Sequence, residues 1–317
     1  MRHEDTDKTM NRGGIPAAMN YPLVKTLKTV NFMAGTASSL AEIKRHRKIA
    51  DRASRLATPI GNVERRAFRV GRIRCEEYKP ETSYDPDYVI LYCHGGGYIS
   101  GGLDYAGNLG VKLAMTTGFR VYSFAYRLAP EHPYPAALED GNALWEYLKK
   151  NVAGADHVLL AGDSAGGNMA LCMTQRLISE GKPAPRELLL FSPWTDMTGT
   201  SASYEANKDI DPVLNKEFVM NSAKAYIGDK DPADPAFSPL FGSFENFPPV
   251  FIMAGRNGIL LDDSIRLKEK IDAAGGKAEL DIEEKGWHVY LHMPGPMTRK
   301  ALKRLAAHVS HEIYGKR

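Results

Sequence analysis

The stretch that decides the fold reads GDSAGG and spans residues 162–167. It follows the apolar run HVLLA at 157–161, which is typical of a buried strand, and it precedes NMALCMTQRLISE at 168–180, which is typical of a helix. A serine between glycines at so tight a strand-to-helix turn has a strained backbone, and only small neighbours fit around it. Its hydroxyl then stands at the carboxyl end of the sheet, beside a helix N-terminus that favours negative charge. The pattern G-x-S-x-G in this context predicts that Ser164 is a nucleophile, whereas the same letters inside a loop would be an ordinary turn.

A second motif, HGGGY at residues 94–98, directly follows the apolar run DYVILYC. Three consecutive glycines leave backbone N–H groups free to point at a ligand oxygen. Acyl transfer passes through a tetrahedral oxyanion, and each preorganised donor stabilises it by about 3 kcal/mol. We expect the donors to be the N–H groups of Gly96 and Gly97, together with that of Ala165 after the nucleophile. A phosphate-binding loop is the alternative, but the lysine of such a loop is missing.

Outside these motifs, short apolar runs alternate with amphipathic stretches, which predicts βαβ units and a mostly parallel sheet. Residues 200–245 interrupt the alternation, because they are polar and rich in Asp and Pro. Together with the polar, helical-looking residues 1–55 they are expected to form a cap on a core made of residues 56–199 and 246–317. Strands are predicted at 88–93, 120–124, 157–161, 187–191, 250–254 and 278–283, a hairpin at 63–80, and helices at 103–117, 136–150, 165–180, 264–274 and 298–314.

Composition excludes several classes of protein. The chain has 317 residues, of which 43% are apolar and 25% charged, as expected for a globular α/β domain with a cap. Its net charge of +3 and the lack of basic stretches with interleaved aromatics argue against a nucleic-acid partner. The basic run at 44–48 is interpreted as a solvated helix face. No run approaches about 18 apolar residues, so no membrane span is expected.

The N-terminus and the cysteines bear on location and on metals. The first ten residues are polar and partly acidic, unlike a signal peptide, so we expect a cytoplasmic protein. Neither the three cysteines nor any H-E-x-x-H motif provides the spacing of a metal site, so no metal is expected.

Several segments together resemble the hormone-sensitive-lipase-like esterases, the bacterial family IV of the α/β-hydrolases. The resemblance implies an α/β-hydrolase fold with an eight-stranded, mostly parallel sheet, flanking helices and a helical cap. It also implies hydrolysis of small-molecule acyl esters without a cofactor, and relatives of this kind often form homodimers. The matching segments lie within residues 85–295 and read HGGGYISG (94–101), YRLAPEHPYPAALED (126–140), GDSAGGNMA (162–170), SPWTDMT (192–198) and DPAFSPLFG (234–242).

The resemblance also places the base of the catalytic triad, whose chain order in this fold is Ser, then Asp or Glu, then His. Trp287-His288-Val289 lies downstream of the strand expected at 278–283, where the family carries its histidine. His288 is therefore expected to take the Ser164 proton and later to donate it to the leaving alcohol. His292 matches no motif and is interpreted as a surface or supporting residue.

The acid departs from the family pattern. In the segment AGRNGILLDD at 254–263, alignment on Leu260 and Asp262 places the acid at position 258, where this chain has glycine. In serine proteases the loss of this carboxylate costs about 10⁴-fold in turnover. Three explanations are open: a substitution in an otherwise active enzyme, relocation of the role to Asp262, Asp196 or a bound water, or lost catalysis. We favour the first, since every other element is present, and Asp262 and Asp196 also fit structural roles as a helix cap and a loop-ordering residue.

These observations predict a serine carboxylesterase, a carboxylic ester hydrolase of short-chain acyl esters, with activity reduced by Gly258. One alternative is a weakly catalytic or non-catalytic protein that binds a small ligand on the same scaffold, as a plant hormone receptor of this family does. The other is an amidase or deacetylase of a small acylated molecule, because the acyl-enzyme chemistry is shared.

Overall fold

The computed structural model describes residues 36–57 and 61–315. The cap predicted for residues 1–35 lies outside the described residues, whereas the helix α2 (Leu40–Ala57) belongs to the predicted N-terminal segment. Among the described residues, no helix combines the length and the apolar character needed to cross a bilayer.

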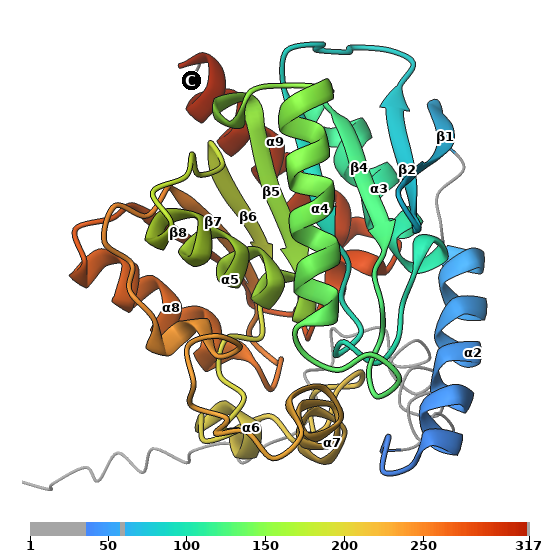
Figure 1. The fold of residues 1–317 in the computed structure, drawn as a ribbon, viewed down its shortest axis with the longest axis vertical. Coiled ribbons are helices and arrows are strands. Elements are labelled where there is room, and N and C mark those ends of the chain that lie inside the picture. The colour runs from blue at the N-terminus through green and yellow to red at the C-terminus, as the bar shows by residue number, and fades with distance from the viewer. Residues whose placement is uncertain (1–35, 58–60, 316–317) are drawn as a thin grey trace, which may run out of the picture.

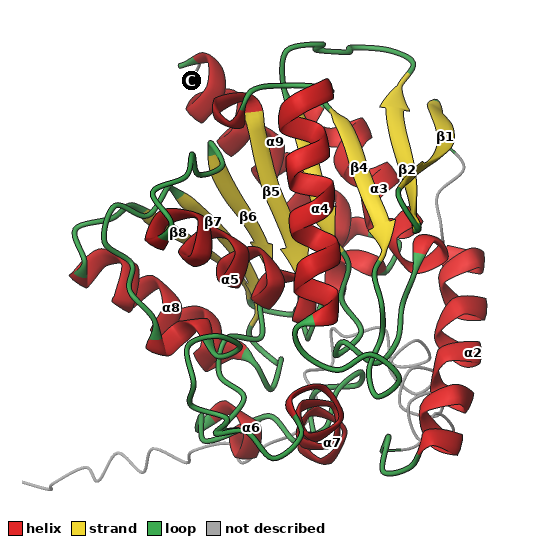
Figure 2. Ribbon diagram, viewed as in Figure 1, coloured by secondary structure: helices red, strands yellow, loops and turns green. Residues whose placement is uncertain are grey.

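An eight-stranded sheet forms the centre of the molecule (Figure 2). Its spatial order is β1-β2-β4-β3-β5-β6-β7-β8, and only the pairs β1–β2 and β2–β4 are antiparallel. The predicted hairpin and the mostly parallel sheet are thus confirmed. The strands are β1 (Val63–Val70), β2 (Ile73–Pro80), β3 (Val89–Cys93), β4 (Arg120–Ala125), β5 (Val158–Asp163), β6 (Glu187–Phe191), β7 (Val250–Gly255) and β8 (Ala278–Glu283).

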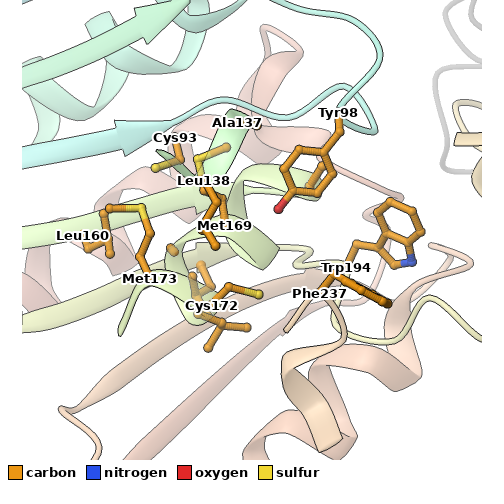
Figure 3. Close-up of a cluster of buried hydrophobic side chains, with 14 of the residues drawn as sticks. Cys93, Tyr98, Ala137, Leu138, Leu160, Met169, Cys172, Met173, Trp194 and Phe237 are labelled. Atoms are coloured by element: carbon orange, nitrogen blue, oxygen red, sulfur yellow. The ribbon is translucent and has the colours of Figure 1, made fainter. Parts of the chain in front are cut away.

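Helices cover both faces of the sheet, because the central strands are apolar on both sides. Buried side chains of α4, α5 and α8 pack on one face and those of α3 and α9 on the other, and each face has its own apolar cluster. Figure 3 shows part of the first cluster, where Met173 of α5 lies next to Leu160 of β5. The bounds are α3 (Leu103–Thr117), α4 (Ala136–Asn151), η1 (Ala155–His157), α5 (Ala165–Ser179), α8 (Leu261–Ala273) and α9 (Pro296–Tyr314).

The segment predicted as a cap insertion lies at the carboxyl ends of the parallel strands, below the sheet in Figure 1. It contains α6 (Ser203–Ala206), α7 (Lys216–Ile227) and the short helix η2 (Pro239–Phe241), while η3 (Tyr290–His292) follows β8. Ligands of open α/β sheets bind at this edge, so the site is expected between these helices and the sheet. The division into core and cap stays a prediction.

Candidate active site

The turn between β5 and α5 holds Ser164 in a strained conformation, with φ 52° and ψ −119°. Glycine is required around it for a steric reason. A Cβ at Gly162 would lie 2.3 Å from the carbonyl oxygen of Gly166, and a Cβ at Gly166 would lie 2.0 Å from that of Cys93. The two glycines of the G-x-S-x-G motif are therefore required by the close packing of this turn.

His288 reaches the nucleophile from the loop that follows β8. Its Nε2 lies 3.0 Å from the Ser164 Oγ, within hydrogen-bonding distance. Burial lowers the pKa of His288 to about 4, against a smaller opposing effect of the Asp163 charge. The imidazole is therefore neutral near pH 7 and able to accept the serine proton. The structure thus brings together the two residues that the sequence predicts as nucleophile and base.

The glycine loop after β3 opens its backbone toward the same place. Gly96 and Gly97 have φ values of 108° and 63°, and a Cβ at Gly96 would lie 2.4 Å from the carbonyl oxygen of Ser100. Within the described residues, the N–H groups of Gly96 and Gly97 make no backbone hydrogen bond. The N–H of Ala165, at the first position of α5, has no intrahelical partner. All three lie close to Ser164 in the fold or in the sequence, as expected for oxyanion donors.

A buried carboxylate beside the nucleophile forms hydrogen bonds with several elements around the site. Asp163 accepts hydrogen bonds from the Tyr92 hydroxyl at 2.6 Å, the Gly95 N–H at 2.8 Å and the Tyr105 hydroxyl at 2.7 Å. Its Oδ2 also lies 3.3 Å from the Nε2 of His292. Burial acts to raise the pKa of Asp163, but His292 and the two tyrosines lower it below its usual value.

The sequence motif does not predict this role of Asp163, because the residue occupies the first x position of G-x-S-x-G, which any amino acid can fill. His292 is buried rather than on the surface and acts as a partner of that carboxylate. Neither contact could be found from motif spacing, because the partners of Asp163 come from distant elements.

The expected acid position lies beside the base. A Cβ at Gly258 would lie 3.1 Å from the backbone nitrogen of His288. Within the described residues, however, the Nδ1 of His288 is buried and has no hydrogen-bond partner. A side-chain carboxylate at position 258 would approach the histidine that needs it, so the alignment of Gly258 with the family's acid is consistent with the structure.

The two carboxylates considered as substitutes are engaged elsewhere. Asp262, in the first turn of α8, accepts a hydrogen bond from the Ser203 N–H at 2.8 Å. Asp196 accepts from the Thr198 N–H at 2.8 Å and pairs with Arg266 at 2.7 Å. The structure thus gives both residues partners that order loops, and among the described residues it shows no contact of either with the Nδ1 of His288.

Ser164 and His288 face a cavity of about 170 Å³. Helix α2 contributes to its wall, α7 and the segment before it supply several apolar residues, and the glycine loop borders it. The lining residues are His46, Ala50, Gly96, Gly97, Ser100, Tyr105, Ser164, Trp194, Val213, Leu214, Phe218, Val219, Ser222, Leu260, His288 and Val289.

Comparisons with known proteins identify the family of the chain. The α/β-hydrolase fold family matches residues 90–292. An esterase of Acinetobacter venetianus is 34% identical over 243 residues, which cover 76% of this chain and 80% of the relative. An acetyl-hydrolase of Streptomyces hygroscopicus is 31% identical over 83% of this chain and 88% of its own length.

Solved structures extend the match. The crystal structure of an esterase from the bacterial hormone-sensitive lipase family superimposes with a TM-score of 0.84 and 30% identity, over 92% of this chain and 98% of that one. A hormone-sensitive lipase from a metagenome library gives a TM-score of 0.83 with 27% identity, over 91% of this chain and 97% of that one. The chain therefore belongs to the α/β-hydrolase fold family, within its bacterial hormone-sensitive-lipase group.

Proposed function

We propose that this protein is a carboxylic ester hydrolase that cleaves small acyl esters through an acyl-enzyme on Ser164. The observation that carries the proposal is the 3.0 Å contact between the His288 Nε2 and the Ser164 Oγ at a cavity bordered by Gly96 and Gly97. The relatives named esterase and acetyl-hydrolase support the same reaction class.

In the first half of this reaction, the Ser164 oxygen attacks the ester carbonyl while the His288 Nε2 takes the serine proton. The carbonyl oxygen becomes an oxyanion, for which the N–H groups of Gly96, Gly97 and Ala165 are the donors. The histidine then returns the proton to the leaving alcohol. In the second half, a water molecule attacks the acyl-enzyme by the same route, and the carboxylic acid leaves.

The size of the cavity favours a short acyl group. Its volume of about 170 Å³ is small beside the roughly 300–1,000 Å³ of pockets for drug-sized ligands. The side chains of Leu214, Phe218 and Val219 make its walls apolar, which suits an alkyl chain. We expect acetyl to butyryl esters to be better substrates than long-chain esters.

A series of p-nitrophenyl esters from acetate to laurate tests the proposal. Ser164-dependent turnover should be highest at the short end, and Ser164→Ala should abolish it. Ser222→Ala is the matched control, because Ser222 lines the same cavity but donates its hydroxyl to the carbonyl oxygen of Phe218. If Ser164→Ala turned over these esters as fast as the parent, the proposal would be wrong.

The glycine at position 258 and the unpartnered Nδ1 of His288 favour a second candidate, a protein that binds a small ligand on this scaffold with little or no turnover. Tight binding of a small acylated ligand without release of acid would distinguish it. An amidase or deacetylase would instead release acid from amides or acylated sugars, with the same dependence on Ser164.

A further inference from the structure

The catalytic histidine of this chain lacks the carboxylate that would normally orient it, yet a second buried carboxylate contacts the loop where that acid is expected. Asp211 comes from the segment between α6 and α7 and is 5% exposed. It accepts a hydrogen bond from the N–H of Ile259 at 3.0 Å, although 48 residues separate the two in sequence. Ile259 directly follows Gly258, so the Asp211 carboxylate lies beside the vacant acid position.

The same carboxylate also lies near the backbone of His288. The backbone N–H of His288 interacts favourably with Asp211, in addition to the N–H groups of Val213 and Leu214 at 2.9 and 3.2 Å. A Cβ at Gly258 would lie 3.1 Å from that same His288 nitrogen. The Asp211 carboxylate and the missing side chain of position 258 therefore approach the same side of the His288 backbone.

Further hydrogen bonds hold the α6–α7 segment against this loop. The Ser203 hydroxyl donates to the carbonyl oxygen of Ile259 at 2.7 Å. The Asn207 side-chain amide donates to the carbonyl oxygens of Gly258 and Arg256 at 2.8 and 3.0 Å. Asp211 is thus fixed at the loop rather than free to turn to solvent.

We propose that Asp211 is a positioning residue that supplies His288 with the negative charge that Gly258 cannot provide. The proposal rests on the esterase function proposed above. Its physical basis is that a carboxylate near an imidazole stabilises the imidazolium that forms when Ser164 gives up its proton. In this chain the carboxylate comes from the segment between α6 and α7 instead of from the loop after β7.

The central test compares Asp211→Asn in two backgrounds. Asparagine keeps the size of the side chain and one acceptor oxygen for the N–H groups of Val213 and Leu214, but it removes the charge. In the parent, Asp211→Asn should lower kcat by about 10- to 100-fold with KM little changed. In a Gly258→Glu background the same change should cost less than about threefold, because the introduced glutamate then supplies the charge.

Asp262→Asn is the matched control, since Asp262 lies in the neighbouring helical turn and its carboxylate binds the Ser203 N–H. It should leave kcat within about twofold of the parent. Thermal unfolding of each variant shows whether it is folded. If Gly258→Glu does not fold, Gly258→Asp provides the second background.

The pH profile of the unmodified protein gives a readout that no folding defect can imitate. Burial raises the pKa of Asp211 to about 6, against its backbone hydrogen bonds. Among the titratable groups, Asp163 raises the pKa of His288 and His292 lowers it. As the pH falls through about 6, Asp211 becomes neutral and kcat should fall before His288 itself is protonated near 4. The pH profile of kcat for Asp211→Asn should lack the step near pH 6.

Three results would overturn the proposal: an unchanged kcat in Asp211→Asn, an equal loss in both backgrounds, or a parent profile without a step near pH 6. A structural role alone would give the equal loss. A parent without Ser164-dependent turnover would overturn the proposed esterase function as well, whereas turnover that does not depend on Asp211 would overturn only this inference.

Discussion

At the scale of single residues, the glycines of the site differ in why they are glycine. Gly162 and Gly166 cannot carry a Cβ, because it would lie within 2.3 Å of backbone atoms. Gly258 has no left-handed backbone, and the nearest atom to its Cβ would be 3.1 Å away. A side chain at position 258 therefore needs only a small shift of its neighbours. Local backbone geometry does not explain the glycine there, which fits a vacated acid position.

Restoring the acid should raise the turnover of this enzyme. Gly258→Glu or Gly258→Asp is expected to increase kcat on p-nitrophenyl acetate by about 10- to 1,000-fold, because the new carboxylate can accept the Nδ1–H of His288. Steady-state kinetics checks this. Gly258→Gln is the control, since it adds the same bulk as glutamate without the charge, and an equal gain from glutamine would contradict the explanation.

Motifs predict Ser164 and the glycine loop because their neighbours in sequence are also their neighbours in space, whereas the family resemblance places His288. Ser164 is surrounded by its own turn, and the conformations of Gly96 and Gly97 are local. Asp211 contacts Ile259, 48 positions away, and Asp163 contacts Tyr92, 71 positions away. No local pattern records such contacts, so the sequence could not indicate their roles.

At the scale of elements, the predicted strands and helices agree with the structure apart from small shifts at their ends, of which the largest is at a helix start. Helix α8 begins at Leu261 rather than at 264, and α9 begins with Pro296 rather than at 298. Proline suits the first turn of a helix because its missing N–H has no partner there in any case. The start of α8 is difficult to predict because Asp262 and Asp263 separate Leu261 from the apolar periodicity that begins at Ile265.

A buried lysine connects α3 with η3, the short helix next to the base. The Nζ of Lys112 donates to the carbonyl oxygens of Leu291 and His292 at 2.8 and 2.9 Å, and to the Asn108 side chain at 2.7 Å. Burial lowers its pKa to about 8. These bonds order the chain just after His288.

Lys112→Met should leave those two carbonyl groups buried without a donor. We expect the free energy of unfolding to fall by about 2–4 kcal/mol, and kcat to fall with it because His288 is less well held. Urea denaturation and steady-state kinetics measure both effects. Lys150→Met, at an exposed lysine of α4, serves as the control, and equal stability of the two variants would refute the role of Lys112.

At the scale of the whole molecule, Arg47 attaches α2 to the core, in addition to the ion pair between Arg55 and Asp104 of α3. The sequence interpretation of the basic run at 44–48 as a solvated helix face is wrong for Arg47. Its guanidinium donates to the carbonyl oxygens of Ile99 and Ala129 at 2.6 and 2.8 Å and pairs with Glu131 at 2.7 Å. That pairing lowers the pKa of Glu131 to about 2. Charge periodicity cannot reveal a basic side chain whose partners are distant carbonyl groups.

Loss of this attachment should affect substrate binding more than chemistry. The neighbouring His46 lines the cavity, so Arg47→Met is expected to raise KM for p-nitrophenyl butyrate by about 3- to 10-fold while kcat changes by less than about threefold. Arg45→Met is the matched control, because Arg45 is exposed on the same helix. Equal KM values in the two variants would show that α2 does not depend on Arg47.

Covalent labelling of the protein with the organophosphate paraoxon, followed by intact mass and peptide mapping, tests most directly whether His288 activates Ser164. We expect one adduct on Ser164, formed at a rate that falls by at least about 100-fold in His288→Ala, because only an activated hydroxyl reacts quickly. The absence of an adduct on Ser164, or labelling at the same rate without His288, would contradict the assignment of Ser164 and His288 as nucleophile and base.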